Sequence, residues 1–140
     1  MRVVEVGCAI IHKNGRILIA QRHLQDSFGG LWEFPGGKRE EGETIEACLS
    51  REAQEELGVG VYPERLLCRR EHGNEDRRIS LFFFFCKWEN GAPRAIDCKD
   101  FRWVGPEEIR SYTFLPWDLE VVEDLILHWE EYFKTAEMGR

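Results

Sequence analysis

The chain has 140 residues, 43% of them hydrophobic, and a formal net charge of −7 at pH 7. This length suits one domain around one core, so we expect residues 1–140 to form a single domain. An acidic chain lacks the positive surface that neutralises a long phosphate backbone, which argues against polymeric DNA or RNA as a partner. No apolar stretch approaches the roughly 20 residues that span a bilayer, and the N-terminus does not resemble a signal peptide, so we expect a cytoplasmic protein with no membrane partner.

The cysteines and histidines show no pattern typical of a metal site. The five cysteines are odd in number and widely spaced, and they contain no Cys-x-x-Cys pair, which predicts reduced thiols rather than a disulfide framework or a zinc site. The histidines also lack metal-ligand spacing, and we assign them no chemistry. These residues are Cys8, Cys48, Cys68, Cys86, Cys98, His12, His23, His72 and His128.

The first predicted elements are two strands joined by a tight turn. Residues 3–11 and 16–20 are rich in Val and Ile, and Asn14-Gly15 between them supplies the positive φ of a hairpin turn. The next segment, from Gly29 to Gly37, holds too many glycines for a helix or a long strand. We expect it to be a structured loop.

A helix is predicted from Thr44 to Leu57. This segment contains neither Gly nor Pro and is full of good helix formers. Thr44 is a suitable N-cap, and Gly58 is a suitable C-terminal stop because glycine adopts a left-handed conformation easily.

The second half of the chain adds strands and a final helix. An uninterrupted apolar run within residues 79–88 is typical of a strand covered on both faces. Strands on both sides of one helix, followed by a second helix, predict an α/β fold with a mixed sheet in an α/β/α sandwich. In chain order we expect strands at 66–71, 79–88 and 101–104, a helical turn from Pro106, a helix at 119–134 and a loose tail at 135–140.

The predicted helix carries Glu52, Glu55 and Glu56. Residues three and four apart lie on one helical face, so we expect the three carboxylates to converge. A divalent cation would relieve their repulsion, and an all-oxygen ligand set favours Mg²⁺, with Mn²⁺ as a possible substitute. The alternative is a solvated acidic face, which is common on helices.

The sequence around this helix, GGKREEGETIEACLSREAQEELGV, resembles the Nudix box. The resemblance implies the Nudix fold and a hydrolase of the MutT-like branch, and the segment LWEFPGG before the box is similar to that branch as well. Ala53 is the one departure, since it is smaller than the residue the family usually has there. The matching positions are Gly37, Glu43, Arg51, Glu52, Ala53, Glu55, Glu56, Gly58 and Val59.

Each matching position also has a physical role. Glycines at 36 and 37 let the backbone approach a substrate phosphate closely. An ion pair between Glu43 and Arg51 would tie the loop to the helix, whereas the alternative pair of Arg51 with Glu55 on the surface would contribute little.

The resemblance also implies the catalytic and metal-binding residues. Catalysis is assigned to Glu43, Arg51, Glu52, Glu55 and Glu56, with Glu52 often the general base in MutT-like members and a later loop supplying it in other branches. Asp97, six residues before Trp103, matches a late carboxylate of the branch, although an exposed loop aspartate is the ordinary alternative. The implied metal ligands are Gly37, Glu52, Glu55, Glu56 and Asp97.

The resemblance further implies where a nucleotide binds. Asp118 matches the position that reads the base, and its alternative role is to cap the final helix. Phe34 would contact the base or anchor the loop in the core, and Trp32 and Trp117 would line the base pocket or fill the core. The implied substrate-binding residues are Arg22, Phe34, Gly36, Gly37, Lys38 and Asp118.

The implied activity is Mg²⁺-dependent hydrolysis of a nucleoside triphosphate to a monophosphate and pyrophosphate. The preferred substrate is 8-oxo-dGTP, which would make the protein a sanitiser of the nucleotide pool, and the alternative is CTP or a modified dCTP. A function of another class is a Nudix-like module that reads a base without hydrolysis. We expect a monomer or a weak dimer.

Overall fold

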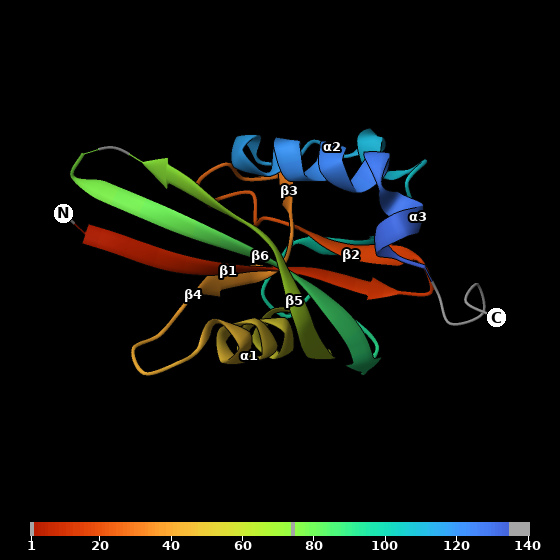
Figure 1. Cartoon of the computed structure of the whole chain (residues 1–140), viewed down its shortest axis with the longest axis horizontal. Coiled ribbons are helices and arrows are strands. Elements are labelled where there is room, and N and C mark those ends of the chain that lie inside the picture. Colours follow the sequence, from red (N-terminus) through yellow and green to blue (C-terminus); the bar gives the residue numbers. More distant parts are fainter. Residues whose placement is uncertain (1, 74, 135–140) are drawn as a thin grey trace.

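The computed structural model describes residues 2–73 and 75–134, and its sheet lies between two helical layers. Helix α1 (Ile45–Leu57) covers one face, and α2 (Leu119–Leu127) and α3 (Trp129–Tyr132) cover the other (Figure 1). This arrangement confirms the α/β sandwich. The strands are β1 (Arg2–Lys13), β2 (Arg16–Gln21), β3 (Trp32–Glu33), β4 (Gly36–Lys38), β5 (Gly60–Gly73), β6 (Arg77–Asn90) and β7 (Asp100–Val104), and two 3₁₀ turns are η1 (Ile109–Ser111) and η2 (Pro116–Asp118).

The sheet is mixed, as predicted. Strands β1 and β6 run parallel in its centre, and the other pairs are antiparallel. The main path is β3-β2-β1-β6-β5, with β4 added to β1 and β7 added to β2. The apolar run of β6 explains its central place, because Phe83 and Phe85 face the core under α2 while Phe84 packs toward α1.

Helix α1 follows the local signals of its sequence. The side chain of Thr44 accepts a hydrogen bond from the amide of Ala47 at 3.0 Å, and Gly58 ends the helix with a φ of 72°. The buried face consists of Cys48, Leu49, Ala53 and Leu57. With this face buried against the sheet, the carboxylate of Glu52 lies beside Gly37 of β4.

Three other expectations have mixed outcomes. The hairpin at Asn14-Gly15 is confirmed, with φ values of 52° and 78°. The predicted loop 29–37 also contains β3 and β4, since pairing with β2 and β1 makes strands of its short extended pieces. Strand β5 is longer than the predicted 66–71, because it follows β6 through three irregular points despite Pro63.

The single final helix predicted at 119–134 is wrong. It breaks at His128, whose φ of −118° separates α2 from α3. The break lets Trp129 turn inward, where its Nε1 donates to the carbonyl of Gly15 at 2.8 Å and its ring packs against Phe133. The predicted tail 135–140 lies outside the described residues.

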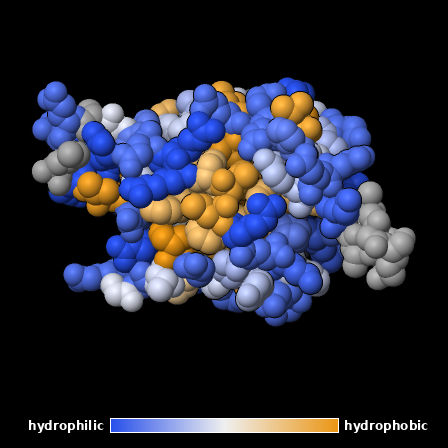
Figure 2. Space-filling view, in the orientation of Figure 1, coloured by the Kyte–Doolittle hydropathy of each residue, from blue (hydrophilic) through white to orange (hydrophobic). Residues whose placement is uncertain are grey.

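The face shown in Figure 2 is mostly hydrophilic, with apolar side chains gathered in its middle. Among the exposed large hydrophobic side chains are Tyr62 and Leu66 of edge strand β5. In the part of the chain that the structure describes, no helix is both long and apolar enough to cross a membrane.

Candidate active site

A cavity of about 700 Å³ opens beside α1, between β4 and the turn η2. One wall, the acidic wall, consists of Glu52 and Glu56 of α1 and the backbone of Gly36 and Gly37. Other side chains of the lining belong to strands in the sheet and to loops on either side of it. They include Cys8, Arg22, His23, Phe28, Glu33, Phe34, Lys38, His72, Arg77, Asp97, Leu115, Trp117 and Asp118.

Glu56 carries the most unfavourable charge of the acidic wall. Burial raises the pKa of its carboxyl well above the ordinary value, and the negative charges of Glu33, Glu52 and Asp97 raise it further. Its Oε1 is buried and has no hydrogen-bond partner among the described residues. Such an atom is costly without a partner, so the wall favours a bound cation.

The carboxyl of Glu52, also in the acidic wall, is subject to opposing effects on its pKa. Burial raises the pKa of its carboxyl, while the hydrogen bond and the positive charge of Arg51 lower it. The Nη1 of Arg51 lies 3.0 Å from Oε2 of Glu52. Glu52 therefore holds one oxygen in a fixed place while it faces the cavity.

The expected convergence of all three glutamates is wrong in one respect. Glu55 does not line the cavity, its side chain is 59% exposed, and its Oε1 pairs with Nη1 of Arg51 at 3.1 Å. The reason is the i,i+4 pair with Arg51, which holds the Glu55 carboxylate outside the cavity. Within residues 2–73 and 75–134, no three acidic, His or Cys side chains form a ready-made metal site.

The acidic wall nevertheless fits a hard divalent cation. It offers carboxylate oxygens from Glu52 and Glu56, and one of them lacks any protein partner. A cation there would remove the cost of burying Glu56 and the repulsion between Glu52 and Glu56. The backbone of Gly37 lies so close to Glu52 in this wall that a β-carbon at position 37 would overlap the carboxylate.

The ion pair predicted between Glu43 and Arg51 is confirmed. Nε of Arg51 donates to Glu43 at 2.6 Å, and Nη2 donates to the carbonyl oxygen of Lys38 at 3.0 Å. Hydrogen bonds from Arg51 and from the amide of Glu40 lower the pKa of Glu43 to about 2. Arg51 thus joins the loop before the helix to the acidic wall.

Two basic side chains among the implied substrate-binding residues line the cavity. Lys38 is exposed at the end of β4. Arg22 is already engaged, because it pairs with Glu33 at 3.2 Å and donates to the carbonyl of Ser27 at 2.8 Å. Burial raises the pKa of Glu33, and this carboxyl contributes to the raised pKa values of both Glu56 and Asp118.

Asp97 stands at the rim of the cavity. Its side chain is 79% exposed, and its Oδ1 lies 3.1 Å from Nε2 of His23. Its amide donates to the carbonyl of Glu56 at 3.1 Å, which holds this loop against the end of α1. The position is therefore near the acidic wall, although the carboxylate faces His23.

Asp118 is buried in the cavity wall with 3% of its surface exposed. It does not cap α2 through its side chain, so that alternative is wrong. Burial, and then the charge of Glu33, raise the pKa of Asp118 to about 8, against a hydrogen bond from the amide of Phe34. At neutral pH this carboxyl is largely protonated and can both donate and accept a hydrogen bond.

The aromatic residues divide between core and cavity. Phe34 does both, because it lines the cavity and packs against Phe83 and Phe114. Trp117 lines the cavity, whereas Trp32 is buried in the core and contacts Tyr112. Of the two alternatives for Trp32, the core role is therefore confirmed.

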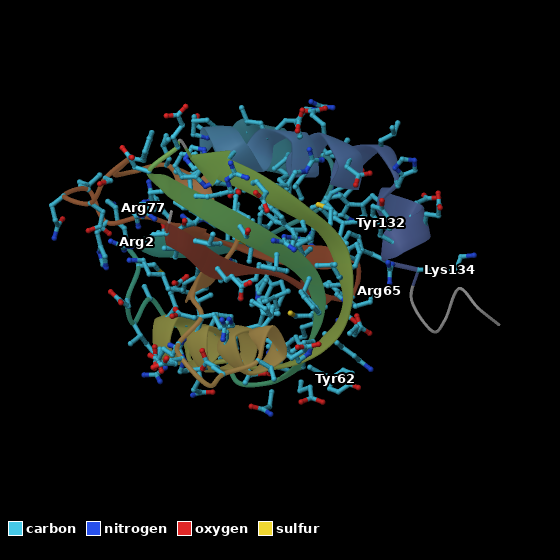
Figure 3. The ribbon with its side chains drawn as sticks, turned by 60° about the vertical axis from the view of Figure 1, so that its left-hand side comes forward. Arg2, Tyr62, Arg65, Arg77, Tyr132 and Lys134 are labelled. Carbon is cyan, nitrogen blue, oxygen red and sulfur yellow. The ribbon has the colours of Figure 1, made fainter. Side chains whose placement is uncertain are left out.

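Several lining residues gave no signal in the sequence. Glu33 sits on a two-residue strand, and His23, His72 and Phe28 are scattered over loops and strand ends. Arg77 reaches the cavity from the start of β6, where it lies next to Arg2 of β1 (Figure 3). Only the pairing of strands brings these positions together.

The fold and this cavity define a hydrolase of the Nudix class. The NUDIX domain model matches residues 1–125, and the chain belongs to this family. Members of the family generally require a divalent metal. The homologues place the chain among the MutT-like nucleotide pyrophosphohydrolases.

Individual relatives support this position. The chain is 35% identical to a CTP pyrophosphohydrolase of Escherichia coli over 88% of its own length and 91% of the relative's. It is 30% identical to an 8-oxo-dGTP diphosphatase of the same organism over 89% and 98% of the two lengths. The solution structure of the E. coli ORF135 protein matches with a TM-score of 0.78 and 33% identity, covering 91% of each chain.

Proposed function

We propose that the chain hydrolyses a nucleoside triphosphate to a nucleoside monophosphate and pyrophosphate, with Mg²⁺ held by Glu52 and Glu56. The observation that carries the proposal is the buried, unpartnered Oε1 of Glu56 beside Glu52 in the wall of a cavity large enough for a nucleotide. Bound Mg²⁺ would neutralise the phosphate oxygens and the charge that develops on them in the transition state.

The remaining residues supply position and proton transfer. Glu52 is our candidate for the general base that takes a proton from the attacking water, because its carboxylate faces the cavity and one of its oxygens is held in place by Arg51. Lys38 and Arg22 would attract the polyphosphate. We place Asp97 and the backbone of Gly37 as supporting members of the metal site, and we leave out Glu55, which pairs with Arg51 outside the cavity.

The proposed base is oxidised guanine, in line with the 8-oxo-dGTP diphosphatases among the relatives. A largely protonated Asp118 offers one donor and one acceptor side by side, and Phe34 would bound the base on one side. Cytosine is the second candidate, because its N3 and N4 atoms offer an acceptor beside a donor and because a full-length relative is a CTP pyrophosphohydrolase.

Steady-state kinetics on four nucleotides test the proposal. The values of kcat/KM for 8-oxo-dGTP, dGTP, CTP and 5-methyl-dCTP should differ, with 8-oxo-dGTP highest under the leading hypothesis and CTP highest under the second. Equal values for all four would overturn both base assignments.

Release of pyrophosphate separates an enzyme from a non-hydrolytic base-reading module. Wild type should release it only with Mg²⁺, and Glu52→Gln should abolish the release. Equal release by the two proteins would show that Glu52 does not carry the chemistry. We further propose that the protein acts as a monomer or a weak dimer in the cytoplasm.

A further inference from the structure

Three aromatic side chains from distant parts of the sequence meet beside the cavity: Phe28, His72 and Trp117. The imidazole of His72 stacks on the indole of Trp117, with ring centroids 4.6 Å apart and 28° between the planes. Phe28 meets the same indole edge-on, with centroids 5.0 Å apart and an angle of 88°. Both distances are in the range of attractive aromatic contacts.

The meeting point is next to the proposed base-reading residue. Trp117 and Asp118 are neighbours in η2, and both line the cavity. A planar base that hydrogen-bonds to Asp118 therefore comes close to the indole. Bases stack readily on aromatic side chains, and the parallel contact of His72 with Trp117 shows that one face of this indole accepts a planar ring.

The position of His72 allows its side chain to rotate while strand β5 stays beside η2. It is exposed at the end of β5 and is followed by Gly73, whose φ is 134°. Two residues earlier, Arg70 forms an ion pair with Glu120 at the start of α2. The ion pair keeps the strand beside η2, and rotation of the side chain can widen the gap between His72 and Trp117.

We propose that His72 is a specificity-determining residue, the movable side of an aromatic clamp that holds the nucleobase against Trp117. Phe28 does not form such a stacked pair, because its ring stands nearly perpendicular to the indole of Trp117. The inference rests on the proposed function, in which Asp118 reads the base. It differs from a second arrangement, in which His72 is a plug that the base must displace.

The test is the substitution His72→Ala, measured with the preferred nucleoside triphosphate. Loss of one stacking partner should raise KM about tenfold, while kcat stays within about twofold because the acidic wall is untouched. His72→Phe should restore KM, since it keeps an aromatic ring. Ribose 5-triphosphate, which has no base, should show the same kcat/KM with wild type and His72→Ala.

His128→Ala is the matched control, because His128 lies outside the cavity at the break between α2 and α3. It should leave KM unchanged. A lower KM for His72→Ala would identify a plug and overturn the clamp, and so would an unchanged KM. An equal loss with ribose 5-triphosphate would also overturn it, since the effect would not concern the base.

Binding experiments separate this proposal from the proposed function. If wild type hydrolysed none of the nucleotides, the proposed function would fail, but the affinity for CMP and 8-oxo-dGMP could still be measured by calorimetry. Weaker binding to His72→Ala than to wild type and His128→Ala would support the clamp. Equal affinities would overturn it.

Discussion

Gly37 of β4 lies so close to Glu52 of α1 that a β-carbon at position 37 would overlap the carboxylate of Glu52. The contact is possible because β4 pairs with β1 while α1 packs over both strands. Glycine at 37 therefore sets the position of a carboxylate in the acidic wall. The structure gives this glycine a steric role in addition to any contact of its backbone with phosphate.

Gly37→Ala should displace the Glu52 carboxylate and lower kcat about 100-fold, the size of effect that a shift of about 1 Å produces in an active site. Circular dichroism should show a folded protein. Gly105→Ala is the control, because a β-carbon there would meet no atom closer than 3.4 Å. If Gly37→Ala kept the kcat of wild type, Glu52 would not need its present position for catalysis.

Glu56→Gln should separate metal binding from stability. Removal of a buried, unpartnered charge should raise the Tm of the metal-free protein by a few degrees, while the rise in Tm on addition of Mg²⁺ and most of the activity should disappear. Thermal melts with Mg²⁺ and with a chelator measure both effects.

Glu55→Gln is the control for this experiment, since Glu55 is exposed and pairs with Arg51 instead of lining the cavity. It should keep most of the Mg²⁺-induced rise in Tm. A metal-free Glu56→Gln protein that melts below wild type, or one that still responds fully to Mg²⁺, would contradict the assignment of Glu56 as a metal ligand.

The fold was predictable where local signals decide the structure. Thr44 and Gly58 mark the ends of α1, and Asn14-Gly15 marks the first hairpin. The break at His128 was not predictable, because it depends on the contact of Trp129 with Gly15, which is distant in sequence. The helical spacing of apolar residues predicted one uninterrupted helix through position 128.

The sequence pointed to part of the candidate site but not to its geometry. The spacing of Glu52, Glu55 and Glu56 places all three on one side of the helix, and only the folded structure shows that Arg51 holds Glu55 away from the cavity. Glu33 gave no signal, because a strand of two residues has no periodicity to detect.

Arg51→Lys should lower kcat about tenfold with a loss of stability of about 1 kcal/mol or less. The guanidinium contacts Glu43, Glu52 and the carbonyl of Lys38 at once, and a lysine cannot reproduce this fork. Arg102→Lys, which alters an exposed pair with Asp100, should change neither quantity. If Arg51→Lys had the kinetics of wild type, a positive charge at position 51 would be sufficient for activity without the guanidinium fork.

Asp118 should make stability fall as the pH rises. Burial and the charge of Glu33 raise the pKa of Asp118 from about 3.8 to about 8 in the folded protein. Between these values the unfolded chain loses the proton while the folded chain keeps it, so ionisation favours unfolding. The effect should be absent below about pH 4 and complete above about pH 8.

Asp118→Asn isolates this effect, because the amide does not titrate while Glu33 and Cys8, the titratable groups coupled to Asp118, remain in both proteins. The free energy of unfolding of the variant minus that of wild type should rise from pH 4 to pH 8 by a few kcal/mol and then level off. Urea melts over this range measure it. A difference that is constant with pH would mean that Asp118 ionises normally in the folded protein, and the carboxyl would then offer the base two acceptors and no donor.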